Sequence, residues 1–124
     1  MDRLSWTESQ QRCQLEGGNL ASVPDQGTSE FLASLYLAAT SMLHSMAVEK
    51  SYWIGGKKIA GSYQWSDGTP FTYNGFSKEC LIQLKDTGKL SDDYCSTDKP
   101  FVCQLPAAGS IGNYTHVDSQ LIIS

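Results

Sequence analysis

The sequence predicts one small α+β domain, in which two helices and several short antiparallel strands are held together by disulfide bonds. A chain of 124 residues with 40% hydrophobic and 18% charged residues suits a single globular domain with its own core. Two aromatic segments, 52–54 and 63–65, precede the turn signals Gly55-Gly56 and Asp67-Gly68-Thr69-Pro70, a pattern typical of strands. Their tryptophans, Trp53 and Trp65, are therefore expected in the core. Four cysteines in so short a chain favour a disulfide framework: Cys13, Cys80, Cys95 and Cys103.

Charge and hydropathy exclude several partners. The formal net charge is -4, the isoelectric point is about 4.9, and no run of Lys or Arg occurs, which argues against binding nucleic acid or an anionic membrane. No segment is long and apolar enough to predict a membrane span. The cysteines indicate an oxidising compartment, but no signal peptide follows Met1. We therefore expect a secreted or extracellular protein whose secretion signal lies upstream of Met1.

The first helix is predicted from its ends. Ser5 and Glu8 have the spacing of a capping box, so a helix should begin there. It should run to about Glu16, because Gly17-Gly18 supplies the left-handed residue that commonly ends a helix. Residues 19–24 read as an extended connection, since Pro24 disfavours helix in the residue before it.

A second helix is predicted by apolar residues at helical spacing, after several N-cap candidates between Asp25 and Ser29. These apolar residues are Phe31, Leu32, Leu35, Tyr36, Ala39, Met42, Leu43 and Met46. His44 lies beside this stripe, and as a lone histidine it carries little functional weight.

The second half of the chain reads as strands and turns. An aromatic loop over 71–79 precedes a strand at 80–84, a turn at 85–89 and a returning strand at 90–95. The final strand of the domain is 100–104. We therefore place the domain at 1–105 and a tail at 106–124, in which 117–123 could add a strand. Asn113 begins an Asn-Tyr-Thr triplet, an acceptor pattern for N-glycosylation.

In order and spacing, these landmarks resemble the C-type lectin-like domain. The resemblance covers residues 4–104, and its strength lies in the shared order of motifs that are individually weak. The motifs are Leu4-Ser5-Trp6-Thr7-Glu8-Ser9, Cys13, Gly18-Asn19-Leu20-Ala21-Ser22-Val23, Glu30-Phe31-Leu32, Trp53-Ile54-Gly55-Gly56, Trp65-Ser66-Asp67-Gly68-Thr69-Pro70, Cys80, Cys95, Pro100-Phe101-Val102 and Cys103.

The resemblance implies two helices flanking two small antiparallel sheets, with disulfides Cys13–Cys103 and Cys80–Cys95. The cysteine positions alone would leave three connectivities open. Members of this family usually place an N-terminal strand beside the one that contains the last cysteine, and this chain begins too late to supply it. Either the tail strand fills that position, or a neighbouring chain or upstream segment does.

The resemblance also raises the question of calcium, through which many members bind sugar. Calcium needs six to eight oxygen ligands, and the expected carboxylates are mostly missing. No Glu-Pro-Asn or Gln-Pro-Asp triplet lies between Phe71 and Cys80, Lys78 stands where a glutamate is expected, and Asp92 alone survives from a Trp-Asn-Asp run. We therefore expect no cofactor and no metal at the usual site, with Glu79 and Asp92 as a weaker alternative.

The favoured function is a calcium-independent extracellular recognition module that binds a protein. Tyrosines with mixed charges suit a protein interface. The candidate ligand-binding residues are Tyr73, Phe76, Lys78, Lys85, Asp92, Asp93 and Tyr94. Tyr73 and Phe76 could instead simply pack the short loop.

Two alternatives remain open. One is a carbohydrate-binding lectin with an atypical site, assembled from turn carboxylates such as Asp86, Asp92, Asp93 and Glu79. The other is a structural component of an extracellular assembly, including a homo-oligomer. An enzyme is not expected, because no phosphate loop, no His-Glu-x-x-His and no nucleophile with a partnering base is found, and His44 and His116 stand alone.

Overall fold

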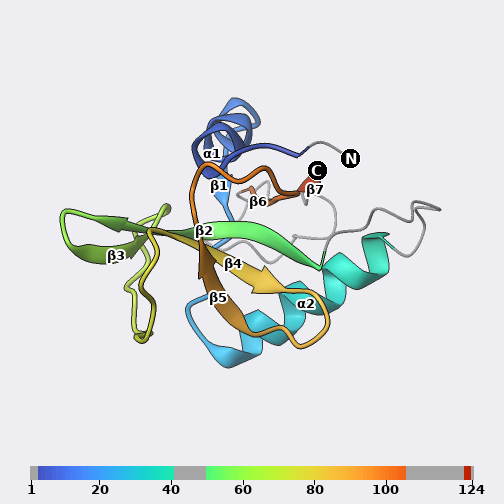
Figure 1. Cartoon of the computed structure of the whole chain (residues 1–124). Helices are drawn as coiled ribbons and strands as arrows, with labels where there is room; N and C mark the ends of the chain where they lie inside the picture. The colour runs from blue at the N-terminus through green and yellow to red at the C-terminus, as the bar shows by residue number, and fades with distance from the viewer. Residues whose placement is uncertain (1–2, 41–49, 106–121, 124) are drawn as a thin grey trace.

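Two helices and two antiparallel sheets make up the fold (Figure 1). The structure is a computed structural model that describes residues 3–40, 50–105 and 122–123. One sheet has the strand order β1-β6-β7, and the other has the order β3-β2-β4-β5. This arrangement confirms the predicted α+β class. The elements are α1 (Trp6–Leu15), β1 (Asn19–Leu20), α2 (Gln26–Thr40), β2 (Ser51–Ile59), β3 (Ser62–Trp65), β4 (Cys80–Leu84), β5 (Leu90–Asp93), β6 (Val102–Gln104) and β7 (Ile122–Ile123).

Helix α1 begins and ends as predicted. The Glu8 amide donates to Ser5 Oγ at 3.3 Å, and the Ser5 amide donates to Glu8 Oε1 at 3.1 Å, which completes the capping box. Gly17 follows the helix with φ +90°, a conformation that glycine adopts without strain. The sequence predicts only a connection after this glycine, but Asn19 and Leu20 form β1 by pairing with β6.

Helix α2 is capped by Asp25, whose Oδ1 accepts the Thr28 amide at 2.7 Å. Leu32 and Tyr36 are buried, as predicted, but Phe31 is 48% exposed and does not belong to the buried face. The helical period explains this difference, because residue 31 lies about 100° away from residue 32 around the axis. Residues 41–49, including His44, lie outside the described part of the chain.

The Gly55-Gly56 pair is not a turn, which corrects the sequence prediction. Both residues lie inside β2, at a shift in its register with β4. A Cβ at Gly55 would meet Leu20 O at 2.6 Å, and one at Gly56 would meet the Leu81 side chain at 2.4 Å. The glycines are therefore required for close packing inside the sheet. The β2–β3 turn lies instead at Ala60-Gly61, where both φ angles are positive (51° and 87°).

The two strand tryptophans form the core, as predicted. Trp53 is 0% and Trp65 is 2% exposed. The indole of Trp53 donates to Leu4 O at 2.8 Å, and the indole of Trp6 donates to Ile54 O at the same distance. These bonds hold the start of α1 against the middle of β2, so that helix and sheet share one interior.

A fully buried glutamine, Gln83 on β4, connects α2 to the larger sheet. Its Oε1 accepts the Tyr52 hydroxyl at 2.7 Å. Its Nε2 donates to Ser29 O at 2.8 Å and to Gly88 O at 3.0 Å. The Ser29 hydroxyl donates to Gly88 O at 2.6 Å, which closes the network. The first turn of α2 is thereby fixed to the β4–β5 turn.

Both implied disulfides are present. Cys13–Cys103 joins α1 to β6, and Cys80–Cys95 joins the start of β4 to the segment after β5. The Cys13–Cys103 bond thus links two elements from opposite ends of the domain sequence, at a sequence separation of 90.

At the end of the chain, β7 pairs antiparallel with β6, with Val102 opposite Ile123 and Cys103 opposite Ile122. The division of the chain at residue 105 stays a prediction. Asn113 and His116 lie outside the described residues. In the described ranges, neither helix is long and apolar enough to cross a membrane.

We expect reduction of both disulfides to unfold the domain. In the chain-entropy model, loops of 90 and 15 residues contribute about 4–5 and about 3 kcal/mol respectively. Together these match the whole stability of a small domain. Circular dichroism melting with and without a strong reductant tests this expectation, and an unchanged melting curve under complete reduction, checked by thiol titration, would contradict it.

We also expect Gln83→Leu to lower the free energy of unfolding by about 2 kcal/mol, since the Tyr52 and Ser29 groups lose their buried partner. Gln64→Leu is the matched control, because Gln64 is exposed on β3 and should change stability by less than about 0.5 kcal/mol. Urea denaturation measures both values. Equal changes in the free energy of unfolding for the two substitutions would show that the Gln83 network contributes no more to stability than an exposed side chain does.

Candidate functional site

The loop between β3 and β4 is filled by its own aromatic side chains. Phe71 lies at its centre, with ring centroids 5.2 Å from Trp65, 5.8 Å from Tyr73 and 6.2 Å from Phe76. Tyr73 and Phe76 are partly buried against the core. Burial raises the pKa of the Tyr73 hydroxyl, and the charge of Asp25 adds to this shift. The two rings therefore shape the loop, while their outer edges face a cavity.

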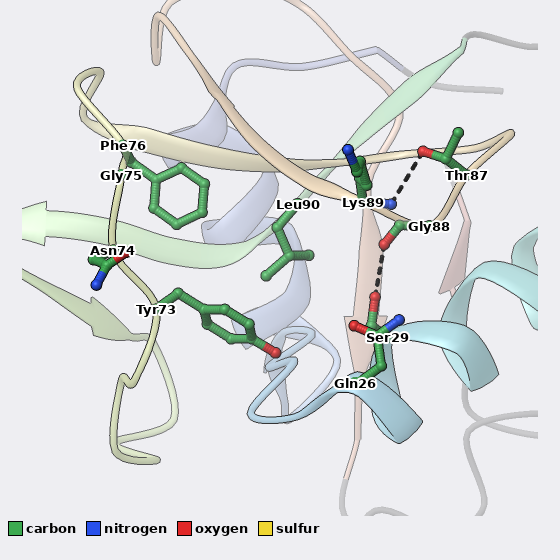
Figure 2. Close-up of a pocket in the computed structure, with 10 residues that line it drawn as sticks. All are labelled: Gln26, Ser29, Tyr73, Asn74, Gly75, Phe76, Thr87, Gly88, Lys89 and Leu90. Carbon is green, nitrogen blue, oxygen red and sulfur yellow. Dashed lines mark hydrogen bonds between the residues drawn. The ribbon is translucent and has the colours of Figure 1, made fainter.

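That cavity, of about 380 Å³, lies between the loop, the first turn of α2 and the β4–β5 turn (Figure 2). Tyr73 and Phe76 form one side, and Ser29, Gly88 and Lys89 form the other, with Leu90 between them. The Ser29–Gly88 hydrogen bond makes one wall rigid.

The carboxylate of Asp92 holds the end of the loop to β5. Its Oδ2 accepts the Lys78 amide at 2.6 Å and the Ser77 amide at 2.7 Å. Burial acts to raise the pKa of Asp92, but these two amides, the Ser77 hydroxyl and the Lys78 charge outweigh it and hold the pKa below its usual 3.8. Asp92 is therefore an anion that closes the loop.

Asp93 and Tyr94 continue this surface. Asp93 Oδ2 forms an ion pair with Lys99 Nζ at 3.0 Å, and its Oδ1 accepts the Tyr94 amide at 2.7 Å. Burial acts to raise the pKa of Asp93, but the hydrogen bonds from Lys99 and from the Tyr94 amide outweigh it and hold the pKa below its usual value. The Lys78 ammonium lies 4.8 Å from the centroid of the Tyr94 ring, which is 65% exposed.

The structure thus divides the predicted site residues into three groups. Lys78, Asp92, Asp93 and Tyr94 lie together, and Tyr73 and Phe76 lie at the cavity. Lys85 is separate, because it follows the last residue of β4, whereas Lys78 precedes the first one. Sequence reasoning missed two lysines: Lys99, which pairs with Asp93, and Lys89, which lines the cavity. The hairpin prediction could have placed Lys89 beside the loop, whereas the Lys99 contact depends on tertiary packing.

Two features of this surface disfavour a calcium ion at this position. Asp92 Oδ2 already accepts two amides, and the neighbouring Lys78 ammonium would repel a divalent cation. In the described ranges, no group of three carboxylates, histidines or cysteines is placed to hold a metal. The weaker alternative of Glu79 and Asp92 as metal ligands stays a prediction.

Solved structures with this architecture are lectin-like domains. Human lithostathine is 28% identical and superposes with a TM-score of 0.65, covering 82% of this chain and 76% of that one. Ovocleidin-17 of the Gallus gallus eggshell is 25% identical, with a TM-score of 0.70, covering 86% of this chain and 87% of that one.

Sequence comparison agrees with the fold. The family model for the Lectin C-type domain matches residues 2–105, so the chain belongs to the C-type lectin domain family. One chain of a snaclec coagulation factor IX-binding protein from Protobothrops flavoviridis is 34% identical over 113 residues, covering 81% of this chain and 83% of that protein. The secretory phospholipase A2 receptor of Mus musculus is 29% identical, covering 84% of this chain but only 7% of the receptor. The chain is therefore a recognition module of a family of binding domains.

We expect Asp92→Asn to lower the free energy of unfolding by about 1–2 kcal/mol at neutral pH, because charged hydrogen bonds to two amides are weakened. The pKa of Asp92 is lower in the folded than in the unfolded state, so its contribution is present above the unfolded value and is lost as pH falls through the folded value. The difference between wild type and variant should therefore shrink below about pH 4.

Thermal melts from pH 7 to acid measure this difference. Asp86→Asn is the matched control, since Asp86 is exposed in the β4–β5 turn and should respond little. A pH-independent difference for Asp92→Asn would show that its charge does not hold the loop.

Proposed function

We propose that this chain is an extracellular recognition module that binds a protein partner without a calcium ion. The observation that carries the proposal is the double amide contact of Asp92, which holds the loop where the family's calcium ligands would be needed. A loop fixed by hydrogen bonds and aromatic packing is already ordered for binding and does not require an ion to order it.

The relatives support a protein partner. One is named for binding coagulation factor IX, and another is named as a receptor for secretory phospholipase A2. A module of this kind fits extracellular use with two disulfides. Because the factor IX-binding relative is one of the chains of a larger protein, assembly of this chain with further chains is also supported.

The proposed contact surface centres on Tyr94 and Lys78. An exposed tyrosine with a cation over its ring offers a large, rigid, amphipathic contact, the type of residue that carries much of the binding energy at interfaces. The adjacent hollow, lined by Ser77, Glu79, Cys95 and Ser96, gives this surface a concave border. Asp93 and Lys99 add a fixed pair of charges at its edge.

We expect calorimetric titration with calcium to give no specific heat and no rise in melting temperature. Screening secreted proteins and glycans against the refolded chain should yield a protein partner that remains bound in EDTA. Tyr94→Ala should lower the affinity for that partner about 30-fold, the loss typical of a central interface tyrosine.

Leu15→Ala is the matched control, because Leu15 is also an exposed apolar residue, at the end of α1, and should leave affinity unchanged. Calcium-dependent stabilisation, or selective binding to glycans alone, would contradict the proposal. Unchanged affinity of Tyr94→Ala would place the interface elsewhere, and equal loss in both variants would show that the effect is not specific to Tyr94.

A further inference from the structure

Three lysines meet at the end of the larger sheet that lies near α2, far from Tyr94. The Lys85 amide donates to Lys50 O at 2.7 Å, and Lys89 O accepts the Leu84 amide at 2.8 Å. The backbone of Lys50, which precedes β2, is thus bonded to that of Lys85, and the β4–β5 turn connects Lys85 to Lys89. Asp86 is the acidic residue of this turn, so the local charge is positive in a chain whose net charge is -4.

These cations are not neutralised within the described part of the molecule. Over residues 3–40 and 50–105, no carboxylate lies within ion-pair distance of the three ammonium groups, whereas Lys99 is paired with Asp93. Lys50 and Lys89 are exposed, and Lys85 is half-buried. Lys85 and Lys89 lie on the β4–β5 turn and Lys50 lies beside it before β2, so this end of the sheet offers positive charge to an anionic partner.

The cavity of Figure 2 continues this surface. Lys89 is one of the three lysines and also lines the cavity. The next residue, Leu90, lies between the Tyr73 and Phe76 rings and the β4–β5 turn. Lys89 is also the charged residue of that lining. The surface therefore offers a recess of mixed lining, in which two aromatic rings and Leu90 lie among polar groups directly beside positive charge, and this suits a ligand that carries both an aromatic ring and negative charge.

We propose that the three lysines Lys50, Lys85 and Lys89 bind an acidic segment of a protein partner, with one aromatic side chain of that segment seated between Phe76 and Leu90. The ammonium groups neutralise the carboxylates, and the recess removes the ring from water. This inference rests on the proposed function, because it names the chemistry of a protein partner, but it uses a different surface.

The probe is a short fluorescent peptide of glutamates around one central phenylalanine, measured by anisotropy at low salt with the intact chain. We expect saturable binding that weakens with salt, and a loss of about threefold for each of Lys85→Gln and Lys89→Gln. Replacing the central phenylalanine by alanine should also weaken binding. Lys58→Gln is the matched control, since Lys58 is exposed at the opposite end of β2 and should leave affinity unchanged.

Equal losses for Lys58→Gln and Lys89→Gln would overturn the inference, as would indifference to the central phenylalanine. Tighter binding to heparin than to the peptide would assign the surface to a sulfated polysaccharide instead. If the acidic peptide fails while a partner found by screening still depends on Tyr94, the proposed function survives and this inference alone fails.

Discussion

The buried side chain of Gln83 makes the contacts on which the relative position of β2, α2 and the β4–β5 turn depends. It is one polar group that satisfies Tyr52 on β2, Ser29 on α2 and Gly88 in the β4–β5 turn simultaneously. Because an unpaired amide would be costly at this depth, the three elements have essentially one relative position in which every group is satisfied. That position also fixes the shape of the cavity and the location of the lysines on the β4–β5 turn.

Much of the fold could be predicted because local signals and tertiary requirements agree. The Ser5 and Glu8 capping box and Gly17 determine both ends of α1, and the burial of Trp53 and Trp65 follows from ring size and strand position. Gly55-Gly56 shows where such reasoning fails. Glycine indicates either a turn or a close approach of neighbouring atoms, and only the contacts with Leu20 and Leu81 decide between them.

The candidate site is harder to predict, because its residues act through partners that are distant in the sequence. Asp92 can be recognised as a surviving calcium ligand, but its bonds to the Ser77 and Lys78 amides depend on how the loop returns to β5. Charge alone makes Lys85 a candidate, and it lies apart from Tyr94. Its actual neighbours, Lys50 and Lys89, come together only through the sheet register.

The Asp92 contact also indicates how the loop would be held in the proposed calcium-free function. A calcium ion would hold carboxylates from separate segments together. Here the two amides and the nearby Lys78 ammonium supply the positive charge that faces one carboxylate, that of Asp92. The donors are part of the chain, so the proposed calcium-free function needs no ion to supply them. Aromatic packing around Phe71 then fills the space beneath the loop, and the surface above it is set by the fold itself.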